Sequence, residues 1–219
     1  MSPVVTVRIV GFAAALAAGL AIAGPVAWGH GEKPHATADK TVTESTPAPK
    51  AGPGGEPSPI AVGGPFALID QTGQPVTDKD FLGRYMLVFF GYANCPGICP
   101  TALKAMVDAV DALGEDGGRV APILITVDPE HDKPETLAPS VAKLHPRFTG
   151  LTGTPEQLAA VAAAYGVTSK PVGRSREGID MFAHGSLVYL MGRDGKLLTI
   201  FPPIIDGPTM AATIRGYLG

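Results

Sequence analysis

The only two cysteines of this 219-residue chain lie in one short segment, Cys95-Pro96-Gly97-Ile98-Cys99. Such a pair suits three kinds of chemistry: a structural disulfide, a redox-active dithiol, or part of a metal site. A disulfide that closes about five residues would restrict the unfolded chain by only about 2 kcal/mol. A purely structural role is therefore the least favoured of the three.

The spacing of the cysteines bears on the other two chemistries. Thioredoxin-type oxidoreductases place two residues between their cysteines, whereas three separate Cys95 from Cys99. The wider spacing weakens the case for an oxidoreductase without removing it. Two thiolates form a soft site that suits Cu(I), and a third soft or borderline ligand would complete a trigonal site. Structural zinc would require four ligands, which the sequence does not offer.

His184, in the segment MFAHGSLVYL, is the natural third ligand. A single histidine beside a strand is more often an ordinary packed residue, so its position alone leaves both interpretations open. His131 and His145 are weaker candidates. Met181 stands three positions before His184, so on an extended chain it should face the other side and pack in the core.

Two elements must position the cysteines. Residues 85–92, YMLVFFGY, form a continuous apolar run typical of a strand buried on both faces, and the cysteine loop follows directly. Pro100 suits the first turn of a helix that ends near Gly114. Because Cys99 precedes a proline, we expect it at the N-cap, where the positive end of the helix lowers a thiol pKa. Phe90 and Tyr92 are expected to form the floor of the site.

Further along the chain, strands and helices alternate. The pattern predicts a short hairpin at 65–77, a strand at 121–128, helices at 134–144, 154–166 and 208–217, and a hairpin at 186–201. This order predicts an α/β fold with a central mixed sheet flanked by helices and an N-terminal hairpin. A cysteine loop between the first long strand and a helix is the thioredoxin-like arrangement.

The first 58 residues differ in composition from the rest. Arg8 precedes an uncharged apolar stretch, and the pattern predicts a signal peptide or membrane anchor over residues 1–28. Residues 29–58 are rich in Pro, Gly, Thr and Ala and predict a disordered linker. The globular domain is expected at 59–219, outside the cytoplasm and, in a bacterium, periplasmic.

Charge and cysteine content exclude two classes of protein. The chain has 17 basic and 20 acidic residues, a formal net charge of −3, and no basic cluster that would neutralise phosphates, so we expect no nucleic-acid partner. Two cysteines are too few for the framework of a small disulfide-rich scaffold.

Taken together, the motifs resemble those of the Sco/SenC copper chaperones. The resemblance rests on the Phe90-Gly91-Tyr92 segment, the two Cys-Pro pairs, the segment ITVDPEHDKPETL and His184 with Tyr189-Leu190, and it covers roughly residues 60–218. It implies a thioredoxin-like domain that binds one copper ion, as Cu(I) or Cu(II), through Cys95, Cys99 and His184.

The resemblance also implies a function and partners. Family members deliver copper to the dinuclear copper centre of cytochrome c oxidase or reduce the cysteines that receive it. The implied partners are the copper-bearing oxidase subunit or another copper protein, a thioredoxin-like reductant, and the membrane through the N-terminal segment if that segment is uncleaved. Such a protein is a metallochaperone rather than an enzyme.

Two departures from the family pattern remove negative charge near the metal. Gly97 and Ala183 stand where the family usually has acidic residues. The loss should weaken Cu(II) more than Cu(I) and loosen the orientation of His184. Asp128 matches the family motif and is either close to the site or a turn residue. Two alternatives stay open: a thiol-disulfide oxidoreductase that uses Cys95 and Cys99 without His184, and a redox or copper sensor.

Overall fold

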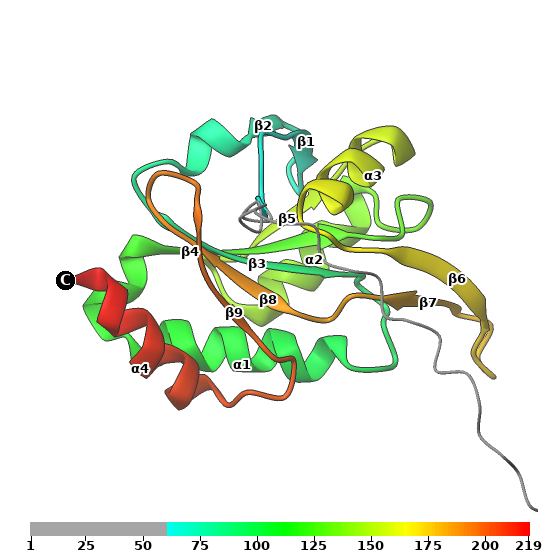
Figure 1. Ribbon diagram of the computed structural model, residues 1–219. Coiled ribbons are helices and arrows are strands. Elements are labelled where there is room, and N and C mark those ends of the chain that lie inside the picture. Colours follow the sequence, from blue (N-terminus) through cyan, green and yellow to red (C-terminus); the bar gives the residue numbers. More distant parts are fainter. Residues whose placement is uncertain (1–60) are drawn as a thin grey trace, which may run out of the picture. The chain divides into compact units, whose positions relative to one another are not determined.

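A mixed sheet of seven strands forms the centre of the computed structural model, which describes residues 61–219 (Figure 1). The strands of this sheet are β1 (Ala67–Asp70), β2 (Pro75–Thr77), β3 (Tyr85–Gly91), β4 (Val120–Thr126), β5 (Thr149–Thr152), β8 (Val188–Met191) and β9 (Leu197–Phe201). Their order across the sheet is β2-β1-β5-β4-β3-β8-β9. Two further strands, β6 (Ser169–Arg174) and β7 (Asp180–His184), pair with each other in a separate hairpin.

The directions of the strands confirm the predicted mixed sheet. β3 runs parallel to β4, with Tyr85 opposite Val120, and antiparallel to β8. β1 and β2 form the predicted N-terminal hairpin. Because β3 and β4 are parallel, their carboxyl ends meet at one edge of the sheet, and the cysteine loop leaves β3 at that edge.

In the part of the chain that the structure describes, four α-helices pack on the sheet. They are α1 (Cys99–Ala112), α2 (Pro134–Leu144), α3 (Pro155–Ala164) and α4 (Gly207–Leu218), each within two residues of its predicted bounds. Thr154 and Gln157 form the predicted capping box at the start of α3. The helices confirm the α/β class that the sequence predicts.

The helices cover both faces of the sheet. All seven residues of β3 are buried, and successive side chains enter different cores. Leu87 and Phe89 pack in the core that includes α1, α2 and α4, whereas Val88 and Phe90 pack in the core that includes α3. Figure 1 shows α1 and α4 on one side of the sheet and α3 on the other.

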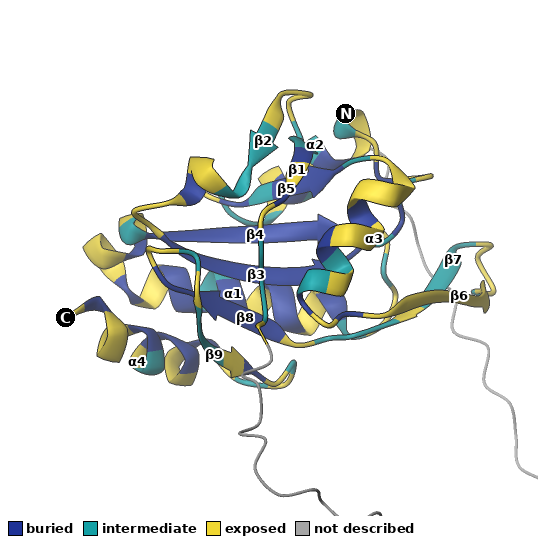
Figure 2. Ribbon diagram, turned by 45° about the horizontal axis from the view of Figure 1, so that its top comes forward, coloured by how far each residue is buried: buried dark blue, intermediate teal, exposed yellow. Residues whose placement is uncertain are grey.

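The β6–β7 hairpin and the short strand β5 are not predicted by the sequence pattern. Every residue of β6 is exposed, and its sequence SKPVGR has neither alternation nor an apolar run. Figure 2 shows this hairpin extending from the buried part of the sheet. β6 exists as a strand because it pairs with β7, which a pattern within one segment does not reveal.

The predicted signal peptide or anchor at 1–28 and the predicted linker at 29–58 lie outside the described residues. Within residues 61–219, no helix has the length and apolar character needed to cross a membrane.

Candidate metal centre

The cysteine loop joins the end of β3 to the first turn of α1. The helix begins at Cys99 itself, and its N-cap is Ile98, with helical φ and ψ of −78° and −21°. The carbonyl of Ile98 accepts hydrogen bonds from the backbone N–H groups of Thr101 (3.0 Å) and Ala102 (3.2 Å). The predicted N-cap position of Cys99 is therefore wrong by one residue, because the restriction before proline is a preference that the first helical turn overrides here.

Both cysteines are free thiols in different environments. Cys99 is buried and Cys95 is half-buried. Gly91, the last residue of β3, is required by this packing. A Cβ added there would lie 3.2 Å from Sγ of Cys99 and 2.6 Å from the ring of Phe89. The strand can approach the first turn of α1 this closely because Gly91 has no side chain.

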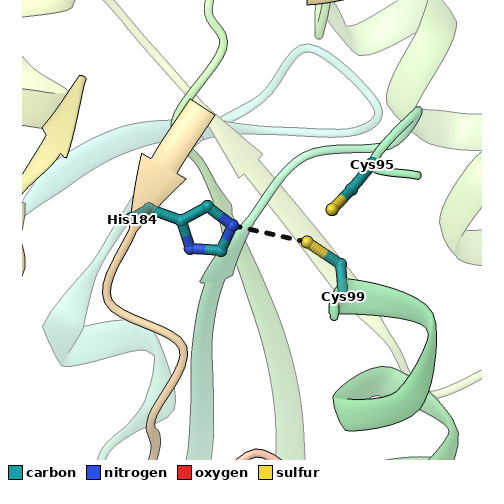
Figure 3. Close-up of side chains that lie close together, drawn as sticks. All are labelled: Cys95, Cys99 and His184. Atoms are coloured by element: carbon teal, nitrogen blue, oxygen red, sulfur yellow. Dashed lines mark hydrogen bonds between the residues drawn. The ribbon is translucent and has the colours of Figure 1, made fainter. Parts of the chain in front are cut away.

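His184, the last residue of β7, reaches the cysteines from the hairpin (Figure 3). Its Nε2 atom lies 3.5 Å from Sγ of Cys99. The ligand atoms of Cys95, Cys99 and His184 all lie within 4.8 Å of one another, and no other such group of cysteine, histidine or acidic residues occurs in residues 61–219. The structure thus brings together the three residues that the sequence analysis selected, and their role as ligands stays a prediction.

The orientation of the His184 ring is set by its neighbours. Nδ1–H donates a hydrogen bond to the carbonyl of Gly185 at 3.0 Å, so in the neutral ring the lone pair of Nε2 faces the sulfurs. Phe89 and Tyr92 contact the ring edge to face, with centroids 6.1 and 6.0 Å away. The hydroxyl of Tyr92 also accepts a hydrogen bond from the backbone N–H of Phe182 in β7, at 3.4 Å.

The aromatic floor was predicted only in part. Tyr92 lies beside His184 as expected, but Phe90 packs on the opposite face of the sheet, against Tyr165 and Tyr189. Phe89 takes the place that was expected for Phe90. The reason is the alternation of side chains along β3, which sends neighbouring residues to opposite faces.

The two thiols share one proton unequally. The hydrogen bond between the two thiols lowers the pKa of Cys95 to about 4. Burial raises this pKa, and a hydrogen bond with His184 lowers it further. The hydrogen bond between the thiols, together with burial, raises the pKa of Cys99. The predicted low pKa of Cys99 is thus wrong: Cys95 is the thiolate. Burial disfavours protonation of His184, but its contacts with Cys95 and the Gly185 carbonyl raise its pKa.

The weaker candidates lie outside this group of three. His145 contacts Asp111 at 3.2 Å, and His131 contacts the carboxylate of Asp128 at 2.9 Å. Asp128 is a buried turn residue. Met181 is half-buried on β7 and absent from both described cores, so its predicted core packing is wrong. Phe182, the next residue of β7, packs against the core instead, and neighbouring residues of a strand face opposite sides.

One residue beside the site was missed by the sequence analysis. Asp132 is 1% exposed, and its Oδ2 accepts hydrogen bonds from Thr126 Oγ1 (2.7 Å) and from the backbone N–H of Ala93 (3.0 Å). Burial raises its pKa. The only signal in the sequence is its place in DPEHD, four residues after Asp128, where a solvated turn is the usual interpretation.

Comparison with known proteins shows the family to which the chain is similar. The SCO1/SenC family model matches residues 55–219. The mitochondrial SCO1 homologs of Mus musculus and Homo sapiens are 39% and 38% identical over 159 residues, which is 72% of this chain. The aligned residues make up 56% and 53% of those relatives, so the chain spans about half the length of the curated proteins that it matches.

Solved structures of Sco proteins have the same fold. Bradyrhizobium japonicum ScoI with copper bound is 39% identical, with a TM-score of 0.66 over 72% of this chain and 99% of that chain. Arabidopsis thaliana ScoI with copper bound is 31% identical, with a TM-score of 0.68 over 72% of this chain and 98% of that chain. The thioredoxin-like fold that the sequence predicts is confirmed by these similarities.

Proposed function

The chain belongs to the SCO1/SenC family, and from that premise we propose that it is a copper-binding metallochaperone that acts outside the cytoplasm. It would deliver copper to the dinuclear centre of cytochrome c oxidase or reduce the cysteines that receive the metal there. The observation that carries the proposal is the convergence of two sulfurs and one imidazole nitrogen within 4.8 Å.

The donor set fits copper. Thiolates are soft ligands that select Cu(I), and a neutral imidazole nitrogen is a suitable third ligand. Cys95 is already a thiolate, because its pKa is lowered to about 4. Cys99 has to release its proton to bind, so metal binding is accompanied by proton release. In the neutral ring, Nε2 of His184 can bind metal without rearrangement, since Nδ1 holds the proton for the Gly185 carbonyl.

Copper in this site is a cargo, and burial suggests the order in which its bonds exchange. Cys95 is half-buried and is followed by the exposed Pro96 and Gly97, whereas Cys99 is buried. A thiolate of a partner can therefore approach beside Cys95 first. The partner would be the copper-bearing oxidase subunit or another copper protein, and a thioredoxin-like reductant would keep both cysteines reduced.

The proposed location rests on residues 1–28. An apolar stretch that follows Arg8 supports export, with the segment either cleaved or kept as a membrane anchor. The curated relatives of mouse and human are named as mitochondrial. The apolar stretch and the names of the relatives agree with a domain that works outside the cytoplasm. In a bacterium, this domain would lie in the periplasm.

A thiol-disulfide oxidoreductase is the second candidate. The low pKa of Cys95 favours it, because a partly exposed thiolate beside a second thiol is the arrangement that attacks disulfides. In that function Cys95 would be the attacking thiolate, Cys99 would complete the exchange, and His184 would be dispensable.

Anaerobic titration of the reduced full-length chain with Cu(I), against a competing chelator, tests the proposal. Wild type, Cys95→Ser, His184→Ala and the control His145→Ala are compared. We expect one copper per chain, bound more weakly after either site substitution and unchanged in the control. Binding that does not depend on His184 would overturn the three-ligand site, and retained disulfide reduction would then favour the oxidoreductase.

A further inference from the structure

The turn Asp128–Asp132 lies between the two segments that supply the candidate ligands. It follows β4 and is closed by a hydrogen bond from the backbone N–H of Asp132 to the carbonyl of Asp128 at 2.9 Å. Its start is fixed by Thr126, whose Oγ1 accepts a hydrogen bond from the N–H of Asp128 at 2.9 Å. Two neighbouring side chains of this turn, His131 and Asp132, contact the two segments that carry the candidate ligands.

The carboxylate of Asp132 contacts the chain leading into the cysteine loop. Its Oδ2 accepts the backbone N–H of Ala93, two residues before Cys95, and also the hydroxyl of Thr126. Both donors therefore converge on one oxygen of a residue that is 1% exposed. This contact ties the start of the cysteine loop to the end of β4.

The imidazole of His131 contacts the strand that carries His184. Its Nδ1 lies 2.9 Å from Oδ2 of Asp128, and its Nε2 lies 3.7 Å from Oδ2 of Asp180. Asp180 is the first residue of β7, four positions before His184, and it also pairs with Arg174 of β6 at 2.6 Å. Every residue of β6 is exposed. β7 is attached to the body through Phe182, which packs edge to face on Tyr92, and the polar link at Asp180 is a second attachment of the hairpin.

We propose that the Asp128–Asp132 turn is a positioning bridge, in which Asp132 holds the cysteine loop and His131 holds β7, so that together they set the separation between the two sulfurs and the imidazole of His184. The inference rests on the proposed function, since it assigns the bridge to the copper site. Asp132 and His131 are positioning residues, because neither belongs to the group of three candidate ligands.

The His131 contact and the Asp132 contact lead to different expected effects on copper affinity. His131 acts through β7 and hence through His184, so its effect on copper affinity disappears once His184 is absent. Asp132 acts through the cysteine loop, so its effect persists without His184. If His131 only stabilised the fold, its substitution would act equally in both backgrounds, because independent effects add.

A double-mutant cycle on the full-length chain tests the His131 contact. His131→Gln, His184→Ala and the double variant are titrated anaerobically with Cu(I), with His145→Gln as a matched control that breaks another histidine–aspartate pair. We expect His131→Gln to weaken Cu(I) binding about two- to fivefold, the range for an exposed ion pair, and to have no effect in the His184→Ala background. Equal effects in both backgrounds would overturn the bridge.

Metal-free protein gives an independent measurement. Amide hydrogen exchange of β7 should be faster in His131→Gln than in wild type and unchanged in His145→Gln. Unchanged exchange in β7 would also contradict the proposal.

The Asp132 contact is tested with two substitutions. Asp132→Asn keeps one acceptor oxygen for both donors, whereas Asp132→Ala removes it. We expect Asp132→Ala to weaken Cu(I) binding about tenfold, with or without His184, and Asp132→Asn to bind within about threefold of wild type. Equal binding by Asp132→Ala and wild type would overturn this part. If Asp132→Ala does not fold, the double-mutant cycle of His131 and His184 alone tests the bridge.

The failure of the proposed function is distinguishable from the failure of the bridge. Wild type that binds Cu(I) without dependence on His184 would overturn both. Dependence on His184 without coupling to His131 would overturn the bridge alone.

Discussion

Sγ of Cys99 lies 3.5 Å from Nε2 of His184, although the two residues are 85 positions apart in the chain. Cys99 is placed by the first turn of α1 and His184 by the end of β7. The contact therefore depends on how the exposed β6–β7 hairpin meets the carboxyl edge of the sheet. Changes in either element should alter the thiols as well as any bound metal.

Thiol reactivity should differ between the two cysteines. Because the pKa of Cys95 is lowered to about 4, this residue is a thiolate at pH 6, while Cys99 keeps its proton. We expect iodoacetamide at pH 6 to modify Cys95 first in the reduced protein, as located by tandem mass spectrometry. Cys99→Ala should slow the reaction, because it removes the hydrogen bond that stabilises the Cys95 thiolate. Faster modification of Cys99 would contradict the assignment.

Gly91→Ala should destabilise the fold and disturb the site. The added Cβ would meet Phe89 at 2.6 Å and Sγ of Cys99 at 3.2 Å. We expect a loss of about 1–3 kcal/mol in the free energy of unfolding, measured by urea denaturation, together with weaker Cu(I) binding. Gly216→Ala in α4 is the control, since no atom lies within 4 Å of its added Cβ. If Gly91→Ala and wild type had equal free energies of unfolding, the close packing at Gly91 would not require glycine.

His131 should titrate above the ordinary histidine pKa of 6.5, chiefly because it is hydrogen-bonded to Asp128 and to a smaller extent because Asp180 is near. Protonated His131 then adds stability that is fully present below pH 6.5 and is lost as the pH rises through its raised pKa. NMR titration of the imidazole measures this value. Asp128→Asn should lower the pKa more than Asp180→Asn does, and the reverse order would contradict the assigned contacts.

Restoring an acidic residue beside His184 should favour Cu(II). Ala183 is exposed, and the family resemblance drawn from the sequence implies an acidic side chain at this position. A carboxylate at this position is attracted more strongly to Cu(II) than to Cu(I), so Ala183→Asp should raise the affinity for Cu(II) relative to Cu(I) about tenfold. The neutral variant Ala183→Asn is the control. Competition titrations with each ion measure the ratio, and equal ratios in the two variants would refute the electrostatic explanation.

Sequence patterns selected three residues that the structure brings together, but they predicted less of what surrounds them. Cys95, Cys99 and His184 were identifiable because their residue types are scarce in the chain and each adjoins a strongly apolar strand. Their mutual distances depend on the β6–β7 hairpin, which has no apolar pattern of its own. A sequence read segment by segment therefore selects these residues without explaining how they meet.

The errors have definite physical causes. Because β3 is buried on both faces, its sequence contains no polar alternation to show that Phe89 rather than Phe90 faces α1. The helix dipole predicted a low pKa for Cys99, but the hydrogen bond shared with Cys95 has the larger effect. Asp132 resembles a solvated turn residue in sequence, and only the fold shows that it is buried beneath the cysteine loop.

X-ray absorption of the Cu(I)-loaded protein tests the central claim most directly, because it counts the atoms bound to the metal. We predict two sulfurs and one nitrogen for wild type, with the nitrogen absent in His184→Ala and one sulfur fewer in Cys95→Ser. A copper ion bound by sulfur alone in wild type, or a nitrogen ligand that survives in His184→Ala, would contradict the site formed by Cys95, Cys99 and His184.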